Sequence, residues 1–104
     1  MPLIQPDQIV MGLILNAGDA KQHIYLALEH AKANNDEACE EEIQLAEKSL
    51  NEAHNVQTAW LTQEANGNNS EISALFIHAQ DHLMTSITEM NLIKEIIELR
   101  REFR

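Results

Sequence analysis

Apolar residues recur every three or four positions along most of the chain, the spacing that places them on one face of an α-helix. In residues 6–33 the recurring positions are Ile9, Leu13, Ala17, Ala20, Ile24, Leu28 and Ala31. Residues 36–65 continue the pattern with Ile43, Ala46, Leu50, Ala53, Gln57 and Trp60, and residues 70–102 with Ile72, Phe76, Ala79, Leu83, Ser86, Met90, Ile93 and Ile97. The pattern predicts three long helices, each with one buried face.

Two polar breaks separate these helices. The break Asn34-Asn35-Asp36 ends the first helix, and its second Asn or its Asp is suited to cap the next one. The stretch Asn66-Gly67-Asn68-Asn69 is a turn, because Gly and Asn tolerate the left-handed conformation that ends a helix. Asn69 or Ser70 is then predicted to cap the third helix. Such short connections favour an antiparallel, up-down-up bundle.

Length and composition agree with an all-α protein of one domain spanning residues 1–104. A chain of 104 residues is too short for two separate cores. Its 44% hydrophobic content is too high for a disordered chain, and its 3 Gly and 2 Pro are too few for the many turns of an all-β fold. The single cysteine, Cys39, cannot form an internal disulfide and is predicted to be structural.

Charge excludes two classes of partner. The chain has a net charge of -10 at pH 7, which repels nucleic acids and anionic lipid surfaces. The amino terminus carries no basic leader, and the apolar run from Ile9 to Leu15 is too short to span a bilayer. We therefore expect a cytoplasmic protein that binds no nucleic acid and does not insert into a membrane.

The third predicted helix has a second apolar face. On a helical wheel Asp81 points about 180° away from the core positions of its own helix. Five apolar residues lie within roughly 60° of it, namely Ala74, Ile77, Met84, Leu92 and Ile96. This face predicts self-association through the third helix. The alternative is a helix covered on both sides by its neighbours in the same chain.

An acidic residue in an association face needs compensation. A carboxylate buried without a partner costs several kcal/mol, so Asp81 should be protonated, paired or bound to a cation. Cyclic symmetry would bring several Asp81 carboxylates together on one axis, where like charges at short range do not all stay ionised unaided. Magnesium prefers oxygen ligands and water and would meet this need.

His78, Asp81 and His82 form a His-x-x-Asp-His cluster in which the two histidines are neighbours one helical turn apart. Two imidazoles at this spacing can contribute to a zinc site, although such sites usually have three or four protein ligands. Alternatively, one neutral imidazole is a nucleophile towards phosphorus and the other donates a hydrogen bond to the phosphoryl oxygens. Taken alone, the spacing favours a purely structural role over either chemistry.

The other histidines are weaker candidates. His23 and His30 are expected to be structural or solvated. His54 lies beside the Ala53–Gln57 core positions, so it is either a hydrogen-bonded core residue or a supporting group for the site. Gly18, in the middle of the first predicted helix, is expected to mark close helix packing, because Gly is a poor helix former.

The segment from His78 to Thr85, His-Ala-Gln-Asp-His-Leu-Met-Thr, resembles the motif of a known family. This is the enzyme IIA component of the lactose/cellobiose (N,N'-diacetylchitobiose) class of the bacterial phosphoenolpyruvate-dependent sugar phosphotransferase system. The likeness extends over nearly the whole chain, through Asn16-Ala17-Gly18-Asp19-Ala20-Lys21, Asn51-Glu52-Ala53-His54 and Gln57-Thr58.

The resemblance implies a phosphotransferase component that forms a homotrimer, a nine-helix bundle. In such a protein His78 accepts a phosphoryl group from the histidine phosphocarrier protein and passes it to a cysteine of the cognate IIB component. Asp81 holds one Mg²⁺ shared by the trimer, and Gln80 and His82 shape the phosphoryl environment. Sugar is not bound directly and is phosphorylated during uptake by the membrane IIC component, so lactose, cellobiose, chitobiose and other β-glucosides all remain open. A divalent-metal-binding helical interaction module is the alternative function.

Overall fold

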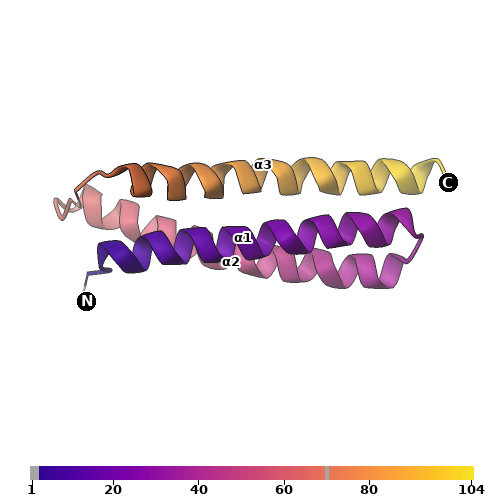
Figure 1. Cartoon of the computed structure of the whole chain (residues 1–104), viewed down its shortest axis with the longest axis horizontal. Coiled ribbons are helices and arrows are strands. Elements are labelled where there is room, and N and C mark those ends of the chain that lie inside the picture. Colours follow the sequence, from indigo (N-terminus) through magenta and orange to yellow (C-terminus); the bar gives the residue numbers. More distant parts are fainter. Residues whose placement is uncertain (1–2, 70) are drawn as a thin grey trace.

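Three long helices make up the computed structural model, which describes residues 3–69 and 71–104. They are α1 (Pro6–Lys32), α2 (Asp36–Ala65) and α3 (Ala74–Glu102), and the described residues contain no strand. Figure 1 shows the helices side by side in an elongated bundle, whose extents are 53 × 23 × 18 Å. The chain runs along α1, returns along α2 and runs along α3 in the direction of α1 (Figure 1). The predicted all-α fold of three helices is confirmed.

Polar residues at the helix boundaries explain where α2 begins and where it ends. The Asn35 side chain caps α2 by accepting a hydrogen bond from the backbone N–H of Ala38 at 3.2 Å, as predicted for this break. Gly67 follows α2 with a φ of 86°, a left-handed conformation that glycine adopts without a steric penalty. The turn predicted at residues 66–69 is therefore in place.

The beginning of α3 differs from the prediction. The helix begins at Ala74 rather than near residue 70, because the Ser73 side chain accepts a hydrogen bond from the backbone N–H of Phe76 at 3.2 Å. Asn69 lies before the helix and is not its cap, and the predicted cap at Ser70 falls outside the described residues. Ile72 was predicted to be a core position but precedes α3 and is 75% exposed.

The core lies along α1, which packs against both other helices, whereas α2 and α3 approach each other much less closely. One cluster of buried side chains surrounds Leu13, Trp60 and Leu83, and a second surrounds Ile24, Cys39 and Ile97. Apart from Ile72, the predicted core positions are buried, except that Leu28 and Leu50 are only partly buried. The looser α2–α3 side leaves room for pockets beside α3.

None of the three helices in the described part of the chain is both long enough and apolar enough to cross a membrane.

Candidate functional site

The two histidines of the cluster lie on the same side of α3, one helical turn apart. His78 is exposed and His82 is partly buried. Their rings are nearly parallel, with planes 6° apart and centroids separated by 6.3 Å. Neither imidazole makes a hydrogen bond to another side chain or to the backbone of residues 3–69 and 71–104. The ring nitrogens of His78 therefore have no competing hydrogen-bond partner among the described residues, and the side chain is exposed to solvent.

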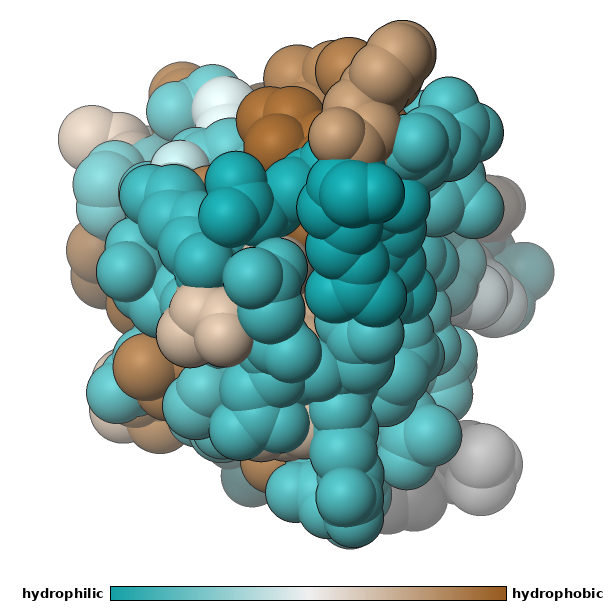
Figure 2. All heavy atoms as spheres, turned by 90° about the vertical axis from the view of Figure 1, so that its right-hand side faces the viewer, coloured by the Kyte–Doolittle hydropathy of each residue, from teal (hydrophilic) through white to brown (hydrophobic). Residues whose placement is uncertain are grey.

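Asp81 lies on the second apolar face of α3, as the helical wheel predicted. It is exposed and forms no ion pair with any side chain in the described residues. Ile77 and Leu92 on the same face are 63% and 59% exposed, and Ala74, Met84 and Ile96 are exposed too. Figure 2 shows apolar side chains gathered along the edge of the bundle where α3 lies, above a largely hydrophilic end. Helices of the same chain therefore do not cover this face, and the alternative of a doubly covered helix is wrong.

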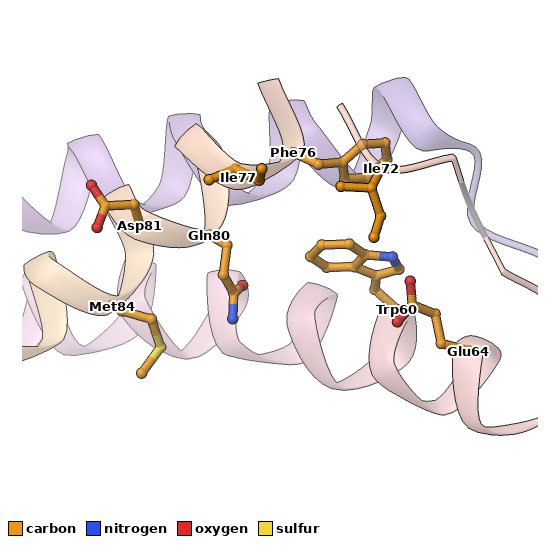
Figure 3. Close-up of a pocket in the computed structure, with 8 residues that line it drawn as sticks. All are labelled: Trp60, Glu64, Ile72, Phe76, Ile77, Gln80, Asp81 and Met84. Atoms are coloured by element: carbon orange, nitrogen blue, oxygen red, sulfur yellow. The ribbon is translucent and has the colours of Figure 1, made fainter. Parts of the chain in front are cut away.

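Gln80 lies apart from the histidine pair, in a pocket of 460 Å³ between α2 and α3. Trp60, Phe76 and Met84 contribute apolar walls, whereas neither histidine lines the pocket. Figure 3 shows the Gln80 amide extending towards α2 and the Asp81 carboxylate pointing away from Trp60. The Gln80 Oε1 atom is buried and has no hydrogen-bond partner in the described part of the chain. Within one chain, Gln80 and His78 therefore do not act on the same group.

Gly18 of α1 lies close to His82. A Cβ atom placed on Gly18 would stand 3.6 Å from Nε2 of His82. The close packing predicted for this glycine is thus packing against a site histidine, which the spacing along the chain did not indicate. An unexplained glycine inside a helix was the only sequence feature that pointed to it.

The remaining histidines lie on α1 and α2. His54 is exposed on α2, so of its two alternatives the buried core residue is wrong. His23 joins α1 to α2, with Nδ1 at 2.6 Å from the Glu42 carboxylate, which is the structural role expected of it. No group of three or more His, Cys, Asp or Glu side chains within residues 3–69 and 71–104 is arranged to hold a metal ion. Among these described residues the His78–His82 pair therefore has no third metal ligand.

Comparisons of the sequence and of the structure with known proteins point to the same family. The model of the family described as "PTS system, Lactose/Cellobiose specific IIA subunit" matches residues 8–101. The chain belongs to this family. It is therefore a IIA component of the sugar phosphotransferase system, and the predicted phosphotransferase component is confirmed.

Individual relatives span nearly the whole chain. The N,N'-diacetylchitobiose-specific EIIA component of Escherichia coli K12 is 40% identical over 98 residues, covering 94% of this chain and 84% of its own. The crystal structure of the cellobiose-specific enzyme IIA of Bacillus anthracis has a TM-score of 0.89 at 39% identity, covering 97% of this chain and 94% of its own. A solution structure of the E. coli IIA(Chitobiose)–HPr complex has a TM-score of 0.81 at 38% identity, covering 96% and 97%.

Proposed function

We propose that this IIA component carries a phosphoryl group on His78 between the histidine phosphocarrier protein and the cysteine of a IIB component. The observation that carries the proposal is the exposed His78 ring, free of hydrogen bonds within the described residues and parallel to a second imidazole. A neutral imidazole has a lone pair available near pH 7. The relative whose structure contains HPr supports that donor for this chain.

The transfer needs no oxidant and no nucleotide. A ring nitrogen of His78 forms a bond to phosphorus while the bond from phosphorus to the donor breaks. The IIB thiolate then attacks the same phosphorus, and the bond to His78 breaks in turn. His78 ends as a neutral imidazole, ready for the next cycle, and the phosphoryl group leaves on sulfur. The bond from phosphorus to the IIB cysteine then breaks as the group passes to the sugar during uptake by the IIC component. The sugar, a β-linked disaccharide of the lactose, cellobiose or chitobiose class, never contacts this chain.

The second apolar face of α3 supports the predicted homotrimer. Leaving five apolar side chains exposed is costly, and burying each one stabilises an assembly by about 1.5–3 kcal/mol before ordering costs. Three copies of the up-down-up chain joined by α3 would form the nine-helix bundle. Because each copy carries a high net negative charge, the copies repel one another. The apolar contact and the neutralisation of acidic groups at the interface have to outweigh this repulsion.

Asp81 fits a shared divalent ion. Its carboxylate is exposed on the apolar face and has no ion-pair partner in the described part of its own chain. Three such carboxylates around one axis, with water, form the all-oxygen donor set that Mg²⁺ prefers. The ion would neutralise charge at the interface. In this proposal the ion serves assembly, and the phosphoryl transfer is assigned to His78.

The same proposal assigns the chain to the cytoplasm, where the phosphocarrier and the IIB component meet it. The acidic surface suits contact with basic faces of these two proteins and disfavours nucleic acid. In this proposal the chain does not insert into the membrane and is linked to the membrane component IIC only through its function.

Incubation of the purified chain with phosphoenolpyruvate, enzyme I and the histidine phosphocarrier protein tests the relay. We expect one acid-labile phosphoryl group per chain, detected by intact mass, and none in the His78→Ala variant. His54→Ala is the matched control, because His54 is also exposed and helical but lies on α2. Normal labelling of His78→Ala would overturn the proposal.

A further inference from the structure

Gly18 has no backbone reason to be glycine. It lies well inside α1, far from either end of the helix, and Gly67 is the only glycine with a positive φ among the described residues. Glycine is among the poorest helix formers, so a glycine here weakens α1. What lies against this side of the helix limits how large a side chain can stand at this position.

The neighbour is His82. Its Nε2 atom is the only heavy atom of the described residues, apart from the nearby backbone of α1 and the adjoining residues, within 4 Å of a Cβ placed at Gly18. The distance is 3.6 Å, an ordinary van der Waals contact. The far end of the His82 ring therefore occupies the space beside Gly18 that a longer side chain would take.

We propose that Gly18 is a positioning residue for phosphoryl transfer, which keeps the His82 imidazole parallel to that of His78 by leaving this space open. The inference rests on the proposed function of His78. The proposal gives a role to Gly18 within the segment Asn16-Ala17-Gly18-Asp19-Ala20-Lys21. The relay mechanism does not otherwise use this segment.

The ring geometry shows what would be lost if His82 moved. The ring centroids are 6.3 Å apart and the ring planes differ by 6°, so the two imidazoles lie near each other on one side of α3. In this proposal a ring N–H of His82 donates a hydrogen bond to an oxygen of the phosphoryl group on His78, and hydrogen bonds to charged groups are the stronger ones. Tilting the ring away from α1 would change the direction of that donor.

Three substitutions separate positioning from packing. Gly18→Ala adds only the Cβ, which fits at 3.6 Å, so His82 should stay in place and α1 should become more stable. Gly18→Val adds two further carbons, and Val has one strongly preferred rotamer in a helix, so the ring should be displaced. Gly18→Ser adds a single oxygen beyond Cβ and is the milder variant if Gly18→Val does not fold.

The first readout is independent of phosphoryl transfer. NMR chemical shifts of the His82 ring, and nuclear Overhauser contacts between that ring and residue 18, should be close to wild type in Gly18→Ala. Both should change in Gly18→Val, and the chemical shifts should change in Gly18→Ser. Circular dichroism confirms that each variant is helical. Unchanged ring signals in Gly18→Val and in Gly18→Ser would overturn the proposal.

The second readout is a double-mutant cycle on the rate at which His78 gains a phosphoryl group from the phosphorylated carrier. Gly18→Val and His82→Ala should each slow transfer by about tenfold to a hundredfold, the range expected for one hydrogen bond to a charged group. In the His82→Ala background, Gly18→Val should cause no further loss. Losses that multiply would show that Gly18 acts through packing and would overturn the proposal.

The two proposals fail in different ways. If the wild-type chain is labelled but His78→Ala is labelled equally, the relay assignment is wrong whatever Gly18 does. If labelling depends on His78 but the Gly18 and His82 losses multiply, only the positioning role is wrong.

Discussion

The reactivity of the Cys39 thiol is determined by its burial in the first turn of α2. Burial raises the pKa of its thiol above the usual value, although the nearby Arg101 guanidinium opposes the shift. We expect alkylation of the native chain at pH 8 to be at least about tenfold slower than in denaturant, because the thiolate is the reactive form. Mass spectrometry of iodoacetamide-treated samples measures both rates. Equal rates would contradict the burial of this side chain.

The raised pKa of Cys39 also determines the direction in which the stability of the fold changes with pH. A thiol whose pKa is raised in the folded state contributes stability below its unfolded pKa, and this contribution is lost as the pH rises through the folded value. Cys39→Ala should therefore lose less stability than the wild type between neutral and alkaline pH. Urea midpoints measured for both proteins across that range would show it.

At the scale of single residues, the sequence predicted how the candidate side chains are placed on α3 better than it predicted their neighbours. The spacing of His78 and His82 placed them one turn apart, and the wheel placed Asp81 on the exposed face, because helix geometry alone determines both. Gly18 and His82 belong to different helices. Their contact depends on how α3 rests on α1, which no pattern along one helix can reveal.

At the scale of elements, Ser73 decides where α3 begins. Its side chain accepts a hydrogen bond from the backbone N–H of Phe76. Replacing a serine cap by alanine costs about 1 kcal/mol, so Ser73→Ala should lower the urea midpoint by a corresponding amount. Asn69→Ala is the control, since Asn69 precedes the helix and is exposed, and its midpoint should match the wild type. Equal losses in the two variants would contradict the cap at Ser73.

The helices themselves were predictable, whereas one boundary was not. Apolar periodicity located α1 and α2 to within a residue at each end, because polar caps interrupt the pattern where these helices start and stop. Before α3, Ile72 falls in phase with the core positions although it lies outside the helix. Periodicity continues past a helix start whenever the preceding segment happens to share its phase. Only the capping hydrogen bond shows where the helix begins.

At the scale of the whole molecule, the exposed face of α3 predicts assembly. If the proposed trimer forms through this face, Leu92→Glu should convert it to monomers, because each copy would lose about 2 kcal/mol of apolar burial and gain a buried charge. Leu45→Glu is the matched control, since Leu45 is an exposed leucine of α2, 45% exposed against 59% for Leu92. Analytical ultracentrifugation should find the control unchanged. A monomeric wild type, or dissociation of both variants, would contradict assembly through α3.

Assembly and ion binding can be separated at Asp81. Asp81→Asn should abolish binding of the proposed divalent ion, as measured by elemental analysis. It should retain or tighten the proposed oligomer, because removing charge from an apolar interface also removes its desolvation cost. A chelator should weaken the wild-type oligomer, because the Asp81 carboxylates of the proposed trimer would then repel one another, and should leave Asp81→Asn unaffected. Dissociation of Asp81→Asn without chelator would instead show that the ion holds the subunits together, and the apolar face of α3 would then be insufficient for assembly.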